Sequence, residues 1–167
     1  VMDRLEDLLE PAAAAVAAGF PRIKLKFRPG WDLPMLDAIR RQHPTHPFHI
    51  DCNSGYRLQD IDLFRAVDEF NLVMIEQPLQ HDDLIDHAEL QGAIRTAVCL
   101  DESITTVRQV EQALRLNSCR YVNVKPGRVG GLTNAVKIHE RCRGAGIPCW
   151  VGGMLESATG AAHCVAL

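Results

Sequence analysis

The sequence predicts an α/β fold: part of a TIM-type (β/α)7β barrel with about six strands and seven helices. Short apolar or β-branched segments alternate with longer amphipathic segments, which is typical of strand–helix units and a parallel sheet. The units recur at a near-constant step, because Lys26, Asp51, Glu76 and Asp101 are each 25 residues apart and Lys125 follows after 24. A parallel barrel brings the carboxyl ends of its strands to one mouth, so these five side chains are expected to converge there.

Six segments are predicted to be strands, since each is short, apolar and bounded by polar or turn-forming residues. In chain order they are residues 22–26, 48–51, 73–76, 98–101, 121–125 and 148–152. Each of the first five ends on one of the five ionisable residues, and the sixth ends on Gly152.

Seven segments between and around these strands have helical spacing or good helix formers. They are residues 3–18, 33–42, 59–70, 82–93, 105–117, 132–144 and 157 onward. Gly19, Gly144 and Gly146 stand near predicted helix ends, where a left-handed residue is commonly needed. Asp32 or Asp82 is expected to cap a helix start.

Length and composition predict one globular unit that acts on a small molecule. The 167 residues are 47% hydrophobic and 23% charged, which is ordinary for a domain with one core. The net charge of −3 and the lack of a basic run argue against a nucleic-acid or membrane partner. No apolar stretch approaches the roughly 18 residues of a membrane span, and no secretion signal opens the chain, so a cytoplasmic location is expected.

The cysteines and the chain ends carry two further expectations. The six cysteines are scattered without a CxxC pair, which argues against a zinc knuckle or a redox motif. The helical pattern at Val1 and the uncapped apolar run that stops at Leu167 predict that the chain is a piece of a longer protein.

Three carboxylates at the ends of neighbouring strands predict a metal site. Asp51, Glu76 and Asp101 form an oxygen-only set suited to Mg²⁺, with Mn²⁺ as a possible substitute. Neither His nor Cys belongs to this set, which argues against zinc. One charged residue at a strand end often marks only where the chain meets water, but several at one mouth would be costly to desolvate without a task.

Two lysines flank the carboxylates in strand order, Lys26 before them and Lys125 after them. A metal, a second cation or burial turns lysine into a usable base near neutral pH. A carboxylate substrate at the metal would hold its α-carbon between the two lysines. The pattern therefore predicts abstraction of a proton next to a carboxylate, through an enediolate that the ion stabilises.

The segments KLK, DCN, EQP, DES and KPGRVGGL together resemble the enolase superfamily, in its muconate-lactonising-enzyme-like subgroup. The longer motifs MIEQPL, CLDESI, VNVKPGRVGGL, IHERC and PCWVGGMLES are similar to those of o-succinylbenzoate synthases and N-acylamino acid racemases. The resemblance implies that Lys26 and Lys125 are acid/base catalysts and that Asp51, Glu76 and Asp101 bind the metal, as superfamily sites combine a Lys or His base with Mg²⁺.

The resemblance also implies auxiliary residues around this centre. They are a cation at Lys24, orienting groups at Asn53, Glu102 and Ser103, and a substrate side-chain pocket at Gly152, Gly153 and Met154 with Glu156 nearby. Two of these assignments have plainer alternatives. Lys24 can be a barrel-interior lysine satisfied by a carboxylate, and a tight turn alone explains the paired glycines.

For activity, the resemblance implies dehydration by an o-succinylbenzoate synthase in menaquinone biosynthesis, with N-acylamino acid racemisation as the alternative. Family members carry an N-terminal capping domain and further terminal barrel strands, which have no counterpart in this chain. The chain by itself is therefore expected to be poorly active, and the parent enzyme is expected to be a homo-oligomer.

Other readings remain open at this point. The glycine-rich KPGRVGG segment could cradle a phosphate, as in phosphate-binding isomerase or aldolase barrels, although three carboxylates would repel such a ligand. A non-catalytic module is the remaining alternative. His43, His46 and His49 are interpreted as solvated loop histidines rather than as a metal tract.

Overall fold

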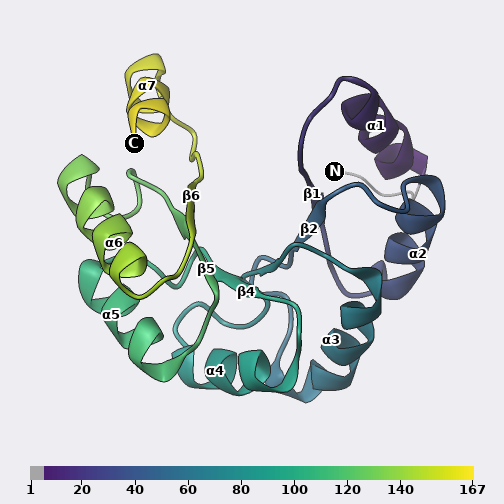
Figure 1. Ribbon diagram of the computed structural model, residues 1–167, viewed down its shortest axis with the longest axis horizontal. Coiled ribbons are helices and arrows are strands. Elements are labelled where there is room, and N and C mark those ends of the chain that lie inside the picture. The colour runs from purple at the N-terminus through teal and green to yellow at the C-terminus, as the bar shows by residue number, and fades with distance from the viewer. Residues whose placement is uncertain (1–5) are drawn as a thin grey trace.

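Six parallel strands follow one another in sequence order around a curved sheet in the computed structural model, which describes residues 6–167 (Figure 1). They are β1 (Ile23–Lys26), β2 (Phe48–Asp51), β3 (Ile75–Glu76), β4 (Val98–Leu100), β5 (Tyr121–Val124) and β6 (Cys149–Val151). The sheet is a half-barrel, so the predicted partial TIM-type fold is confirmed. All six predicted strands form, although β3 keeps only two residues of the predicted four.

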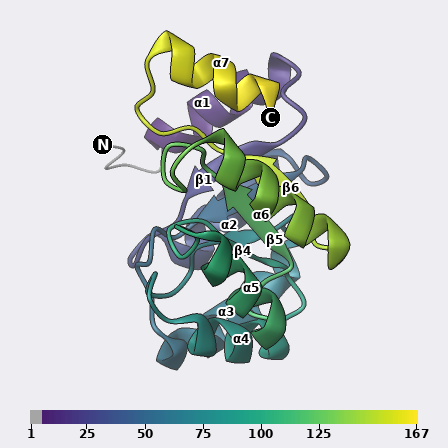
Figure 2. The same ribbon diagram turned by 90° about the vertical axis from the view of Figure 1, so that its left-hand side faces the viewer.

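Helices cover the convex side of this arc (Figure 1). They are α1 (Glu6–Ala17), α2 (Asp32–Gln42), α3 (Ile61–Val67), α4 (Leu84–Ala93), α5 (Val107–Leu116), α6 (Leu132–Gly144) and α7 (Ala158–Ala166). Figure 1 shows α1 and α7 at the two ends of the arc, and both lie at the top of the view in Figure 2. Positions 3–5 of the first predicted helix lie outside the described residues. No helix within residues 6–167 is long and apolar enough to cross a membrane.

Some predicted helix boundaries need correction. The helix predicted over 59–70 is divided into the 3₁₀ turn η1 (Leu58–Asp60), α3 and a second 3₁₀ turn, η2 (Asp68–Phe70). Helix α4 is capped by Asp83 and not by Asp82, since the Asp83 side chain accepts hydrogen bonds from the N–H groups of Ile85 and Asp86. Asp32 is the first residue of α2 and does not cap it.

Left-handed residues stand at two of the three predicted glycines. Gly19 has a φ of 82° and Gly146 has a φ of 72°, which confirms their role after α1 and α6. Gly144 is the last residue of α6, and its φ is not positive, so the prediction of a left-handed residue is wrong there. Asn117, with a φ of 57°, ends α5 in the same conformation, because Asn tolerates it better than most side chains.

Alternation along the strands separates an apolar face from a polar one. Leu25, Ile50 and Ile75 belong to the hydrophobic core that the sheet shares with the helices. Because successive side chains of a strand point to opposite faces, Lys24 and Glu76 project to the inner, concave face. The strands that carry the functional side chains are therefore fixed in place by the apolar side chains of their opposite face, which pack in the core.

The register of the strands staggers the five ionisable positions. Lys26 pairs with Asp51, and Asp51 pairs with Glu76, so these three are level. Glu76 then pairs with Cys99, which leaves Asp101 two residues further along. A barrel needs such stagger because its strands are tilted against the axis.

Candidate active site

Three carboxylates from consecutive strand ends lie buried on the concave face. Asp51 ends β2, Glu76 ends β3 and Asp101 directly follows β4. Their side chains are at most 1% exposed. Buried carboxylates are costly unless cations or hydrogen-bond donors compensate them. Each of the three has such partners.

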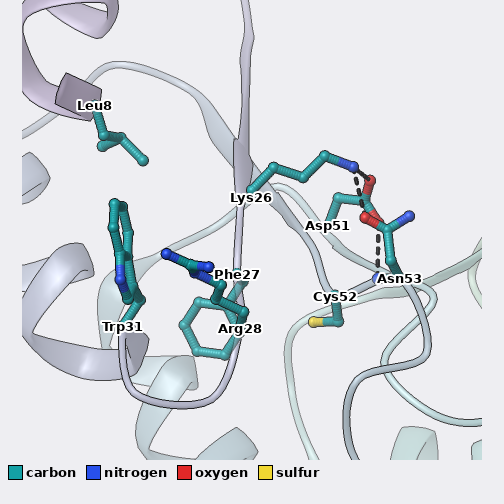
Figure 3. A pocket seen from close by; sticks show the side chains of 8 residues that line it. All are labelled: Leu8, Lys26, Phe27, Arg28, Trp31, Asp51, Cys52 and Asn53. Carbon is teal, nitrogen blue, oxygen red and sulfur yellow. Dashed lines mark hydrogen bonds and ion pairs between the residues drawn. The ribbon is translucent and has the colours of Figure 1, made fainter. Parts of the chain in front are cut away.

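Asp51 holds two lysines at one oxygen. The Oδ2 atom lies 2.6 Å from Lys26 Nζ and 3.0 Å from Lys24 Nζ. Figure 3 shows the Lys26 side chain extending toward Asp51 and Asn53. The Lys26 side chain is 61% exposed, which leaves its ammonium group accessible to a ligand. Lys24 thus contacts the same carboxylate as Lys26, and its role as an auxiliary cation stays a prediction.

Glu76 has partners from three other strands. Its Oε2 atom lies 2.8 Å from Lys24 Nζ and 3.6 Å from His49 Nε2. Its Oε1 atom accepts a hydrogen bond of 2.9 Å from Asn123 Nδ2. Burial raises the pKa of Glu76, but the contacts with His49, Lys24 and Asn123 outweigh it and lower that pKa to about 2.

The position of His49 differs from the prediction of a solvated loop histidine. It is not a solvated loop residue: it lies in β2, only 3% exposed, with its ring packed edge-on against Trp150 at 5.6 Å between ring centroids. His43 and His46 do lie before the strand, but they are half-buried against the ring of Phe48 and their Nε2 atoms are buried, so the prediction of solvated side chains is wrong for them too. The sequence did not indicate that His49 faces the inside of the barrel, because a single polar residue in an apolar segment is a weak signal.

Asp101 is paired with two cations of its own. Lys125 Nζ lies 2.7 Å from Oδ2, and Arg128 donates to Oδ1. Burial raises the pKa of Asp101, as does the neighbouring Glu102 carboxylate, and the two cations offset this only in part. Arg128 was not singled out from the sequence, although it stands in the quoted KPGRVGGL motif, three residues after Lys125.

Asn53 connects the two halves of this site. Its Oδ1 atom accepts a hydrogen bond of 2.5 Å from Lys26 Nζ, and its Nδ2 atom donates to Glu102 Oε1 at 2.9 Å. Its own N–H donates to Asp51 Oδ1 at 3.0 Å. Asn53 has a φ of 43°, a left-handed conformation that Asn adopts more readily than most residues. Asn53 thus contacts Lys26, Asp51 and Glu102, and its orienting role stays a prediction.

A cavity opens beside Lys26. Its volume is about 390 Å³, and its wall combines polar groups with apolar ones. It is lined by Leu8, Lys26, Phe27, Arg28, Trp31, Asp51, Cys52 and Asn53 (Figure 3). A space of this size beside charged groups suits a small molecule.

One known protein family matches nearly the whole chain. Residues 7–167 match the family described as enolase C-terminal domain-like. The chain belongs to this family. The enolase-superfamily resemblance of its motifs is thereby confirmed.

The chain matches only part of the length of two relatives with assigned activities. The chain is 48% identical, over all of its length, to an o-succinylbenzoate synthase from Geobacillus kaustophilus and spans 44% of that protein. It is 42% identical over 98% of its length to an N-succinylamino acid racemase from Thermus thermophilus, of which it also spans 44%. The chain thus corresponds to less than half of either enzyme.

A solved structure has a similar fold. A dipeptide epimerase from Cytophaga hutchinsonii, complexed with Mg and the dipeptide D-Ala-L-Val, matches 98% of the chain with a TM-score of 0.89 and 25% sequence identity. The chain spans 46% of that protein. Magnesium and a small carboxylate ligand are therefore found in a structural relative of this barrel.

The remaining predicted residues of the enolase-like barrel lie at two places. Ser103 is buried and accepts a hydrogen bond of 2.7 Å from Gln77 Nε2. Gly152 follows β6, where an added Cβ would lie 2.3 Å from Asn123 Oδ1. Close approach of Asn123, and not only a turn, therefore requires this glycine.

The loop after Gly152 is more exposed. The Met154 side chain is half exposed, and its Sδ atom lies 3.8 Å from Arg128 Nη2. Glu156 folds back on its own loop, where it accepts from the Met154 N–H and lies beside Gly153. Met154 is thus connected to the site through Arg128, whereas Glu156 stabilises the loop.

The donor set suits a hard metal ion, but the ligands are not assembled. Within residues 6–167, no three carboxylate, imidazole or thiol groups converge closely enough to hold an ion. The ammonium groups of Lys24, Lys26 and Lys125 contact these carboxylates. A buried oxygen of the neighbouring Glu102, Oε2, has no hydrogen-bond partner among the described residues. Buried, oxygen-only and anionic, this surface fits Mg²⁺ in its chemistry.

Proposed function

We propose that residues 1–167 form the C-terminal catalytic barrel of an o-succinylbenzoate synthase, a lyase of menaquinone biosynthesis. The observation that carries this proposal is the placement of Lys26 and Lys125 on either side of three buried carboxylates. The 48% identity to an o-succinylbenzoate synthase supports the reaction. Because the chain spans 44% of that enzyme, the activity belongs to a longer protein.

Lys26 is the proposed base, and its neighbours Lys24, Asp51 and Asn53 set the charge around its amino group and its orientation. Its ammonium group is exposed, whereas Lys24 is more deeply placed on the same Asp51 oxygen. When Lys26 loses its proton, Lys24 still neutralises Asp51. Asn53 accepts from Lys26 and directs its nitrogen toward the mouth. The same lysine then returns the proton to the leaving hydroxide.

Lys125 is proposed to act from the other side as a positive charge near the substrate. It is 13% exposed and paired with Asp101, which limits its movement. Mg²⁺, held by Asp51, Glu76 and Asp101, would supply positive charge that favours the substrate carboxylate and the anion left by proton removal. Mn²⁺ offers the same oxygen preference and is expected to replace it.

The racemase reaction is the second candidate, because two lysines on opposite sides of one site can each serve one enantiomer. The 42% identity to an N-succinylamino acid racemase supports it. The cytoplasmic location and the homo-oligomeric state stay predictions.

The test uses the intact protein with Mg²⁺ and two substrates. The cyclohexadiene carboxylate precursor of o-succinylbenzoate is followed by absorbance, and N-succinyl amino acids are followed by α-proton exchange in D₂O. Rapid dehydration with negligible exchange is expected and supports the synthase. Strong exchange or racemisation would favour the racemase. If neither reaction occurred, or if Lys26→Ala left the rate unchanged, the proposal would be wrong.

A further inference from the structure

We infer that Gln77 is a positioning residue that holds Asp101 in place relative to Glu76. Gln77 directly follows β3, is completely buried and belongs to no predicted catalytic or ligand set. This inference rests on the proposed function, because it concerns two of the proposed metal ligands.

The Gln77 side chain is fully engaged with the segment that carries Asp101. Its Oε1 atom accepts hydrogen bonds from the N–H of Asp101 at 3.0 Å and from the N–H of Ser103 at 3.1 Å. Its Nε2 atom donates to Ser103 Oγ at 2.7 Å and to the carbonyl of Leu79 at 3.2 Å. A carboxamide can make all four bonds, because its oxygen accepts from two N–H groups and its nitrogen carries two donors.

The Gln77 backbone is tied to both neighbouring strands. Its N–H donates to the Cys99 carbonyl of β4 at 2.8 Å, and its carbonyl accepts from Ser54 N–H, just after Asn53, at 2.9 Å. Gln77, which precedes Pro78, has a φ of 39°. A positive φ is unusual for a residue other than glycine. Such a conformation persists when the surrounding contacts determine it.

These contacts give Gln77 a specific consequence for the site. Asp101 lies beyond β4, so ladder hydrogen bonds do not hold its backbone. The N–H of Asp101 is held instead by a side chain whose own residue adjoins Glu76. Gln77 thus couples the last carboxylate of the set to the middle one. Loss of this coupling is expected to weaken metal binding.

The test compares two buried glutamines that flank the same strand. Gln91 binds the start of β4, where its Oε1 accepts from Val98 N–H at 2.7 Å and its Nε2 donates to Thr96 O at 3.3 Å. Gln77→Met and Gln91→Met in the intact protein each remove hydrogen bonds from buried backbone groups. Urea unfolding, amide hydrogen exchange over residues 99–105, and Mn²⁺ titration of metal-free protein are measured.

Both variants are expected to be less stable, but only Gln77→Met should weaken Mn²⁺ binding, by tenfold or more, and speed exchange at Asp101 and Ser103 by tenfold or more. Gln77→Glu keeps the acceptor for both N–H groups, so these amides should stay within threefold of wild type. This second variant preserves the exchange test if Gln77→Met does not fold.

Unchanged Mn²⁺ affinity in Gln77→Met, or equal exchange in the two methionine variants, would overturn the inference. Loss of amide protection in Gln77→Glu as large as in Gln77→Met would also overturn it. Wild-type protein that binds no Mn²⁺ would instead contradict the proposed function, and the exchange data alone would then decide whether Gln77 positions Asp101.

Discussion

Lys24 Nζ lies 2.8 Å from Glu76 Oε2, although Lys24 stands on β1 and Glu76 on β3. The contact crosses the inner face over β2, whose Asp51 also meets the same ammonium group. Burial lowers the pKa of Lys24, but the two carboxylates outweigh it and raise that pKa. One cation therefore balances two buried anions on adjacent strands.

Removing this cation is expected to destabilise the fold. Lys24→Met should lower the free energy of unfolding by roughly 2 kcal/mol, less than a fully buried pair would lose, because the lysine is partly solvated. Lys24→Arg should recover most of the loss. Urea unfolding without metal measures both. Lys137→Met, on the exposed side of α6, is the control and should change stability by less than about 0.5 kcal/mol.

Acid should remove the stabilisation that Glu76 provides. Its pKa is about 2 in the folded protein against an ordinary value of 4.5. A depressed pKa stabilises the fold above the unfolded value, and this contribution is lost as pH falls from 4.5 toward 2. Because Lys24 helps to lower the pKa, the folded-state pKa of Glu76 should be higher in Lys24→Met, so the contribution should be smaller and its loss should be complete at a higher pH. Parallel stability curves for both proteins between about pH 5 and pH 3 would contradict this.

Asp68 is expected to matter for stability and not for catalysis. Its Oδ1 atom accepts from Thr96 N–H at 2.7 Å, and its Oδ2 atom accepts from Arg95 N–H at 2.8 Å. Burial raises the pKa of Asp68, but these bonds lower it overall. Asp68→Ala should cost about 1–3 kcal/mol in urea unfolding. Asp62→Ala, which breaks an exposed pair with Arg65, should cost less than about 0.5 kcal/mol.

Gly152→Ala tests the close approach at the end of β6. The added methyl group would overlap the Asn123 side chain, which donates to Glu76. We expect a loss of about 1–3 kcal/mol in stability together with reduced activity. Gly92→Ala in α4, where an added Cβ meets nothing within 4 Å, is the matched control and should stabilise by about 0.4–1 kcal/mol. Equal effects of the two substitutions would refute the steric argument.

The two lysines should differ in kinetic importance if the protein is a synthase. Lys26→Ala should lower kcat for dehydration by about 10²–10⁴-fold, because the base is removed. Lys125→Ala should lower it less, since Lys125 supplies charge and not the proton transfer. If the protein is instead a racemase, each variant should lose α-proton exchange with one enantiomer of an N-succinyl amino acid in D₂O. Equal dehydration losses would argue against the proposed division of roles.

Much of this architecture follows from local signals. The step of 24–25 residues between Lys26 and Lys125 reflects one strand and one helix per unit, and that period alone predicts a parallel barrel. Helix boundaries were less predictable. Asp82 and Asp83 are adjacent possible caps, and only the path of the chain into α4 decides between them.

The sequence by itself determined which five ionisable residues gather at the carboxyl ends of the strands, because a strand's end is encoded in its apolar run and its turn. The tertiary structure alone decided the partners: Lys24 with Glu76, Asn123 with Glu76, Arg128 with Asp101, and Gln77 with the backbone of Asp101. These contacts join residues that belong to different strand–helix units. They depend on stagger and curvature, which arise from packing of the whole sheet against its helices and leave no local pattern in the chain.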